Sequence, residues 1–100
     1  MEYQLVIEFT GDSPENFQRV TDFEEILDEN LKSGKVDGND VGQGIINIFI
    51  ITEHPEICFG QVIDIISGRS APTAAGYRPL EGEDYVRLWP PGDKTPFELR

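Results

Sequence analysis

The segment from Val36 to Ser67 constrains the fold more than any other part of the chain. It combines a glycine-rich stretch, the apolar run Ile45–Ile51 and the sequence Thr52–Pro55, which is typical of a helix start. The near-continuous apolar character of Ile45–Ile51 predicts a strand with both faces at least partly covered. Because proline is well tolerated in the first turn of a helix, we expect a helix from Pro55 that packs behind this strand.

The N-terminal third predicts a second strand and a second helix. Residues 3–9 alternate, with Tyr3, Leu5, Ile7 and Phe9 on one face. Ser13 followed by Pro14 then predicts a helix start. Side chains at helical spacing predict one buried stripe, which consists of Phe17, Val20, Phe23 or Glu24, Leu27 and Leu31. Gly34 between Lys32 and Lys35 is the expected helix end.

The remaining elements follow from turn residues. Residues 36–44 predict a short irregular strand, with a bulge or an edge at Gly38 and a tight turn at 42–44. In the second helix we expect Gly60 to lie close to the sheet, and Gly68 to end the helix. Residues 76–80 and 85–89 predict two further extended segments, and the tail after Pro90 predicts an extended arm.

The order of these elements predicts a single domain over residues 1–100 of the α+β class. The order strand, helix, strand, strand, helix, strand is that of the ferredoxin-like split βαβ (βαββαβ) arrangement. We expect an antiparallel sheet with both helices on one face, since this buries both apolar stripes, and an extra C-terminal strand. The strand at 45–52 should lie inside the sheet and pair with residues 3–9.

Charge limits the choice of partners. Nineteen acidic against eight basic residues give a net charge of −11, which opposes binding to nucleic acid and to anionic membranes. Residues 1–67 hold fourteen acids and three bases, so one side of the domain should be acidic. This acidity favours solubility or a protein partner with a basic patch. The candidate partner surface consists of Asp22, Glu25, Asp28, Glu29, Asp37 and Asp40.

The chain carries one cysteine, Cys58, which excludes an internal disulfide. It falls in the apolar stripe of the second helix, so a buried thiol is the preferred interpretation. The sequence begins without the basic and apolar regions of a signal peptide, and the run Ile45–Ile51 is too short to span a bilayer. We therefore expect a cytoplasmic protein.

No set of residues predicts a catalytic or metal site, and we expect no cofactor. Asp37, Asn39 and Asp40 lack the ligand spacing of a calcium loop and instead suit a turn. The pair Gly42 and Gly44 precedes a strand, whereas phosphate loops open a helix. His54 and Cys58 stand four residues apart, which allows a thiol–imidazole pair or two metal ligands, but helix-entry chemistry explains His54 better.

The sheet face opposite the helices is the candidate binding face. A wholly solvated face would not carry Phe49 and Ile51, so we expect it to be covered. The cover is the C-terminal arm, a second copy of the chain in a homodimer, or a ligand. The candidate residues of this face are Glu8, Asn47, Phe49, Ile51, His54 and Trp89.

The stretch from Asp37 to Ile50, together with 77–80 (Tyr-Arg-Pro-Leu), resembles small uncharacterised bacterial proteins of ferredoxin-like type. The resemblance covers about half of the chain and implies no catalytic residue. The acidic profile is also similar to that of immunity proteins of toxin systems. Because the acidic bias comes without any convergent set of catalytic residues, we expect a non-enzymatic protein-interaction module. The alternatives are a small-molecule-binding protein or enzyme that uses the open sheet face, and an immunity-type protein that neutralises a basic toxin.

Overall fold

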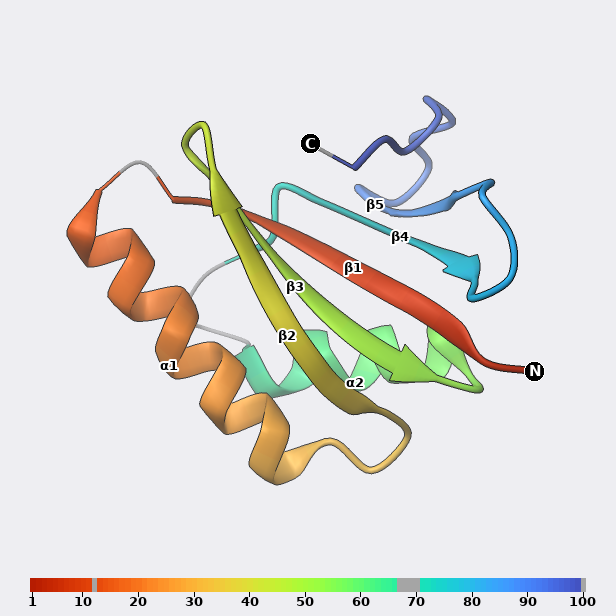
Figure 1. Ribbon diagram of the computed structural model, residues 1–100, viewed down its shortest axis with the longest axis horizontal. Helices are drawn as coiled ribbons and strands as arrows, with labels where there is room; N and C mark the ends of the chain where they lie inside the picture. The colour runs from red at the N-terminus through yellow and green to blue at the C-terminus, as the bar shows by residue number, and fades with distance from the viewer. Residues whose placement is uncertain (12, 67–70, 100) are drawn as a thin grey trace.

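The computed structural model describes residues 1–11, 13–66 and 71–99 as an α+β fold (Figure 1). Its elements are β1 (Tyr3–Thr10), α1 (Pro14–Asn30), β2 (Lys35–Gly42), β3 (Ile45–Thr52), α2 (Pro55–Ile66), β4 (Ala74–Pro79) and β5 (Val86–Trp89). The five strands form one sheet in the order β2-β3-β1-β4-β5, and every neighbouring pair is antiparallel. The sheet thus has two edges, β2 and β5.

β3 lies inside the sheet between β1 and β2, which confirms the prediction from its apolar sequence. Its register with β1 sets Ile48 opposite Ile7 and Ile46 opposite Phe9. These four side chains are buried on one face of the sheet, where they pack with residues of both helices in a single core. Both helices therefore cover the same face of the sheet.

The β2–β3 hairpin has the two-residue turn that its glycines predict. Gln43 and Gly44 connect the closing pair Gly42 and Ile45, and both turn residues have positive φ, at 52° and 77°. Such turns match the natural twist of the two strands. The predicted irregularity at Gly38 is also confirmed, since the register shifts between Val36 and Gly38 and Gly38 has a φ of 119°.

α1 starts as predicted and ends earlier than predicted. The Ser13 hydroxyl accepts a hydrogen bond from the Asn16 amide at 3.1 Å, ahead of Pro14 in the first turn. The helix stops at Asn30, and its capping residue Leu31 is extended, so the expectation of an end at Gly34 was wrong. The loop after α1 is instead bound to α2, where Gln61 accepts a hydrogen bond from the Ser33 hydroxyl at 2.8 Å.

Two further details of the helices differ from expectation. Phe17 is 45% exposed, because the contact of α1 with the core begins one turn later, at Val20. Gly60 is exposed and a Cβ there would meet open space, so its predicted approach to the sheet was wrong. The close approach occurs at Gly34, where a Cβ would lie 2.8 Å from the Cys58 sulfur. Gly68, the expected end of α2, lies outside the described residues.

Candidate functional site

The open face of the sheet, opposite the helices, carries two buried polar residues in its centre. Glu8 and Asn47 are directly paired across β1 and β3, and they are only 2% and 1% exposed. The Thr73 hydroxyl donates to the Glu8 carboxylate at 2.8 Å, and the Thr73 amide donates to the Glu8 carbonyl at 2.8 Å. Hydrogen bonding of this kind offsets much of the cost of burying a carboxylate.

The C-terminal arm, residues 90–99, covers part of this face with one aromatic side chain. Phe97 is buried against Val6 and Ala74, and its ring lies 5.1 Å from that of Tyr85. Gly76 makes room for it, since a Cβ at this position would lie 2.6 Å from Phe97 Cγ. The arm is therefore one cover of the open face, while Phe49 and Ile51 remain half-buried beside it.

Arg87 of β5 holds the arm in place. Its Nε donates to the Thr95 carbonyl at 2.7 Å and its Nη2 to the Pro96 carbonyl at 3.3 Å. The guanidinium also lies over the Phe97 ring, 5.6 Å from the centroid. Within the arm, Asp93 accepts from the Thr95 amide at 2.8 Å, and this bond holds the pKa of the Asp93 carboxyl below its usual value. Between the arm and the sheet lies a cleft of about 310 Å³, bordered by Glu8 and Arg87.

Two of the residues proposed for the open face lie elsewhere. Trp89 packs against the helix-side core, where its ring is 6.0 Å from Phe59, and its Nε1 donates to the Pro72 carbonyl at 2.9 Å. A register shift between Ala75 and Gly76 in the β4–β5 pair changes which β5 side chains face the helices, and sequence alternation gives no sign of it. His54 is exposed at the start of α2. Tyr85, just before β5, packs on the open face beside Phe97, although it is not among the candidate residues.

All the proposed acidic residues of α1 and β2 are exposed, and the two elements enclose a groove. This acidic groove, of about 290 Å³, is lined by Thr21, Glu24, Glu25, Asp28, Val36 and Gly38. Asn39 Nδ2 donates to Glu24 Oε2 at 2.6 Å, which links the helix to the strand. From the sequence, Glu25 and Asp28 of this lining are expected on the partner surface, but Glu24 is expected only as an alternative to Phe23 in the buried stripe. Its position is intermediate, half-buried between helix and strand.

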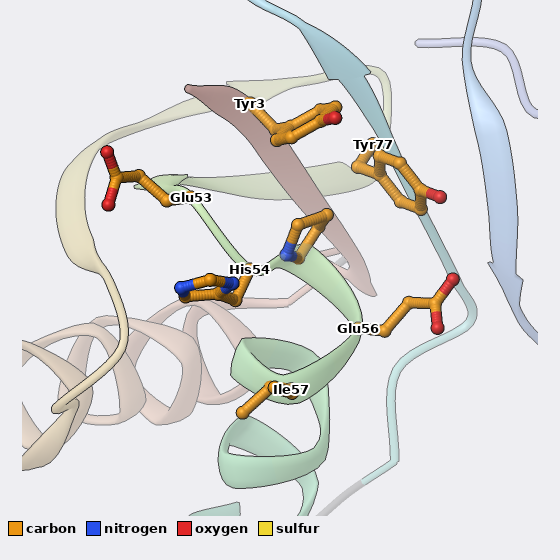
Figure 2. A pocket seen from close by; sticks show the side chains of 7 residues that line it. Tyr3, Glu53, His54, Glu56, Ile57 and Tyr77 are labelled. Carbon is orange, nitrogen blue, oxygen red and sulfur yellow. The ribbon is translucent and has the colours of Figure 1, made fainter. Parts of the chain in front are cut away.

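A second pocket of about 290 Å³ lies where α2 begins, on the helix side of the sheet. Figure 2 shows Tyr3, Tyr77 and Glu56 on one side of it and His54 and Glu53 on the other. The rings of Tyr3 and Tyr77 meet edge to face, with centroids 5.6 Å apart. Burial, followed by the nearby Glu56 carboxylate, raises the pKa of the Tyr77 hydroxyl above its usual value. Such a pocket of aromatic rings and carboxylates suits a positively charged group.

The buried thiol of Cys58 confirms the structural interpretation of this residue. It lies under the loop at Gly34, with Ser33 and Thr52 as hydrogen-bonding neighbours. Burial raises the pKa of the thiol above its ordinary value of 9.0, which outweighs the opposite effect of the two hydrogen bonds. Since a neutral thiol is a poor nucleophile, this position does not favour thiol chemistry. The contact of Cys58 with His54 runs through the backbone, where the His54 carbonyl accepts a hydrogen bond from the Cys58 amide at 2.8 Å.

Comparisons with known proteins do not supply a function. No protein-family model, curated protein or solved structure gives a significant match to the chain. In the part of the chain that the structure describes, no three His, Cys, Asp or Glu side chains are grouped so as to hold a metal ion. Over the same residues, neither helix has the length and apolar character required to cross a membrane. The function must therefore be inferred from the acidic groove, the pocket at the start of α2 and the sheet itself.

Proposed function

We propose that the protein is a non-enzymatic interaction module that binds a basic protein partner through the acidic surface of α1 and β2. The observation that carries this proposal is the acidic groove, where carboxylates of Glu24, Glu25 and Asp28 border an outer strand of the sheet. The described lining holds no Lys or Arg that would neutralise them. Complementary charge raises the association rate and selects the partner. A toxin-neutralising role would be one instance of this function.

The test compares two variants with the same change in charge. The first is Glu25→Gln with Asp28→Asn and Glu29→Gln, all exposed on α1. The matched control is Glu81→Gln with Glu83→Gln and Asp84→Asn, three exposed acids in the connection to β5, the opposite edge of the sheet. Each protein is used as bait in an extract of the source organism at low and at moderate salt.

We expect wild type and the control to capture the same basic protein, and the α1 variant to lose it. Capture should weaken as salt increases, because charges are screened over about 8 Å at physiological ionic strength. Identical captured proteins for all three baits would contradict the proposal and leave solubility as the role of these acids.

We also infer that the first four strands and the two helices form a ferredoxin-like unit, to which β5 is added. The alternation of strands and helices supports this inference, as does the placement of β1 beside β3 and β4 with both helices on one face. The fifth strand is the departure from that arrangement. A fold of this type is shared by many functions, so it does not narrow the choice of function.

A second candidate function, binding of a small organic cation, is favoured by the pocket in Figure 2. Tyr3 and Tyr77 offer aromatic rings, and Glu56 offers a carboxylate close to them. Titration with tetramethylammonium, followed by tyrosine ring signals in NMR, tests this candidate. Saturable shifts that disappear in Glu56→Gln would support it, while shifts that are linear and equal in both proteins would contradict it.

A further inference from the structure

We propose that the partner docks by adding an extended strand to the free edge of β2, and that this strand carries a basic residue at every second position. The inference rests on the proposed function and adds to it the conformation and the side-chain pattern of the partner. It requires a free backbone edge, an edge that is not protected, and more acidic groups on one side of the edge than on the other.

The phase of hydrogen bonding in the sheet identifies the free backbone groups. The Gly11 amide donates to the Gly44 carbonyl at 2.8 Å, so the even-numbered residues at this end of β3 bond toward β1. The odd-numbered residues of β3 then bond toward β2, where Asn47 pairs with Asp40 and Ile45 with Gly42. Because hydrogen bonding alternates along an antiparallel strand, the amides and carbonyls of Asn39 and Val41 are directed to the outer edge.

The second half of β2 has no lysine, proline or bulge of the kind that protects an edge strand, and its one charged side chain, Asp40, lies on the side of Asn47, away from the helices. Proteins block such edges with lysine, proline, a bulge or a very short strand. In β2 the bulge and Lys35 both lie in the first half, before Asn39. The opposite edge, β5, is followed directly by Pro90 and Pro91. Residues 39–42 are therefore the open length of edge on the described sheet, and all four are exposed.

The side chains beside this edge define the partner. Asn39 and Val41 face the helix side, opposite Ile48 and Ile46, and Asn39 bonds to Glu24 of α1. An added strand would point alternate side chains to that side, and those beside Asn39 would lie near Glu24, at the end of the acidic groove. Lys or Arg at those positions would meet the carboxylates of the acidic groove, while the intervening residues would face away from it. Val41, 47% exposed, offers an apolar contact in the same row.

A second copy of the chain is a poorer occupant of this edge. Pairing of β2 with β2 would bring two α1 helices together, and the exposed acids of each include Asp22, Glu25, Asp28 and Glu29. Like charges at short range oppose such an interface. A basic extended segment has the opposite charge, and its backbone supplies the donors and acceptors that the edge lacks.

The experiment uses the full chain and two synthetic peptides of equal composition. One alternates Lys and Thr over seven residues, and the other places the same residues in two blocks. Affinity is measured by titration calorimetry, and the site is located by amide shifts and hydrogen exchange in NMR. We expect the alternating peptide to bind about tenfold more tightly than the block peptide, since only its lysines can all face the groove. The Asn39 and Val41 amides should shift and become protected from exchange.

Two protein variants and one modified peptide test the backbone contact. Val41→Pro removes an outward amide and should abolish binding of the alternating peptide, whereas Val41→Ala keeps the amide and should bind it within about threefold of wild type. If Val41→Pro does not fold, N-methylation of alternate peptide residues removes the same hydrogen bonds from the other side. Sedimentation of the free protein checks for pairing between copies, which would replace the peptide as the occupant and overturn the proposal.

The outcomes separate this proposal from the proposed function. Equal binding of both peptides, with shifts confined to α1 and dependence on Glu25, Asp28 and Glu29, would overturn strand addition and leave the acidic surface as a binding site. If neither peptide binds but the α1 charge variant still loses the captured partner, strand addition is likewise overturned and the acidic surface remains a binding site. Absence of binding with unchanged capture by every variant would overturn both.

Discussion

The face of the sheet that carries Ile7 and Ile48 is closed by two helices, whereas the open face is closed over part of its area by one side chain of the C-terminal arm. The helix side contains only apolar side chains and one thiol in its buried cluster. The open face instead has Glu8 and Asn47 buried at its centre. Apolar burial contributes roughly 25 cal/mol per Å², so the larger apolar cluster contributes most of the stability. The polar face therefore adds less to the stability of the fold.

The largest expected effect tests the helix-covered face. Ile48→Ala leaves a cavity between β3 and the helices, where Ile48 is fully buried. We expect the free energy of unfolding to fall by about 2–5 kcal/mol, because the lost transfer energy adds to the cost of the cavity. Urea denaturation measures it. A loss comparable to that of an exposed site, such as Val86→Ala, would show that the helices do not close this face.

The second prediction tests the arm on the open face. Phe97→Ala should cost about 1–3 kcal/mol, less than the ~3–5 kcal/mol of a phenylalanine in a central core, because the arm can detach. Gly76→Ala should have a similar cost, since its Cβ would lie 2.6 Å from Phe97 Cγ. A double-mutant cycle measures their coupling.

In that cycle, Gly76→Ala should cost much less when Phe97 is already alanine. Additive costs would contradict the contact. The unmodified chain should sediment as an 11.3 kDa monomer if the arm is sufficient cover. Removal of residues 91–100 should expose Val6 and Ala74 and promote self-association.

A smaller effect is expected from the thiol on the helix-covered face at alkaline pH. Burial raises the pKa of Cys58 in the folded state above 9.0. The unfolded chain then loses its thiol proton first, so the contribution to stability is complete below pH 9 and is lost as the pH rises toward the folded value. The unfolding free energy of wild type should fall more steeply above pH 9 than that of Cys58→Ala, by at most about 1.4 kcal/mol per pH unit. Parallel curves would show an accessible thiol.

The smallest effect is expected at the uncovered margin of the open face. Asp40 of β2 is exposed and lies opposite Asn47 of β3. Asp40→Asn should change the unfolding free energy by no more than about 0.5 kcal/mol, as is usual for a surface position. Calcium should leave the Tm of both proteins unchanged. A calcium-dependent rise in the Tm of wild type alone would identify a ligand of the folded state.

Local patterns in the sequence were sufficient for the elements and for much of the topology. The apolar run of β3 predicted an interior strand, and Ser13 with Pro14 predicted the start of α1. Gly38 predicted the bulge, and the stripe of α2 predicted a buried Cys58. These signals are short in range: periodicity, capping and turn geometry depend on residues within one or two turns of each other.

Only the tertiary structure decided how distant segments meet. The end of α1 depends on hydrogen bonds that Ser33, in the following loop, makes with Gln61 of α2 and Thr52 of β3. The side to which Trp89 points depends on the β4–β5 register, and the position of Phe97 depends on space left by Gly76. The acidic groove likewise requires Glu24 and Asn39, fifteen residues apart, to come together. Such contacts depend on register and packing between segments, and no local pattern in the sequence encodes them.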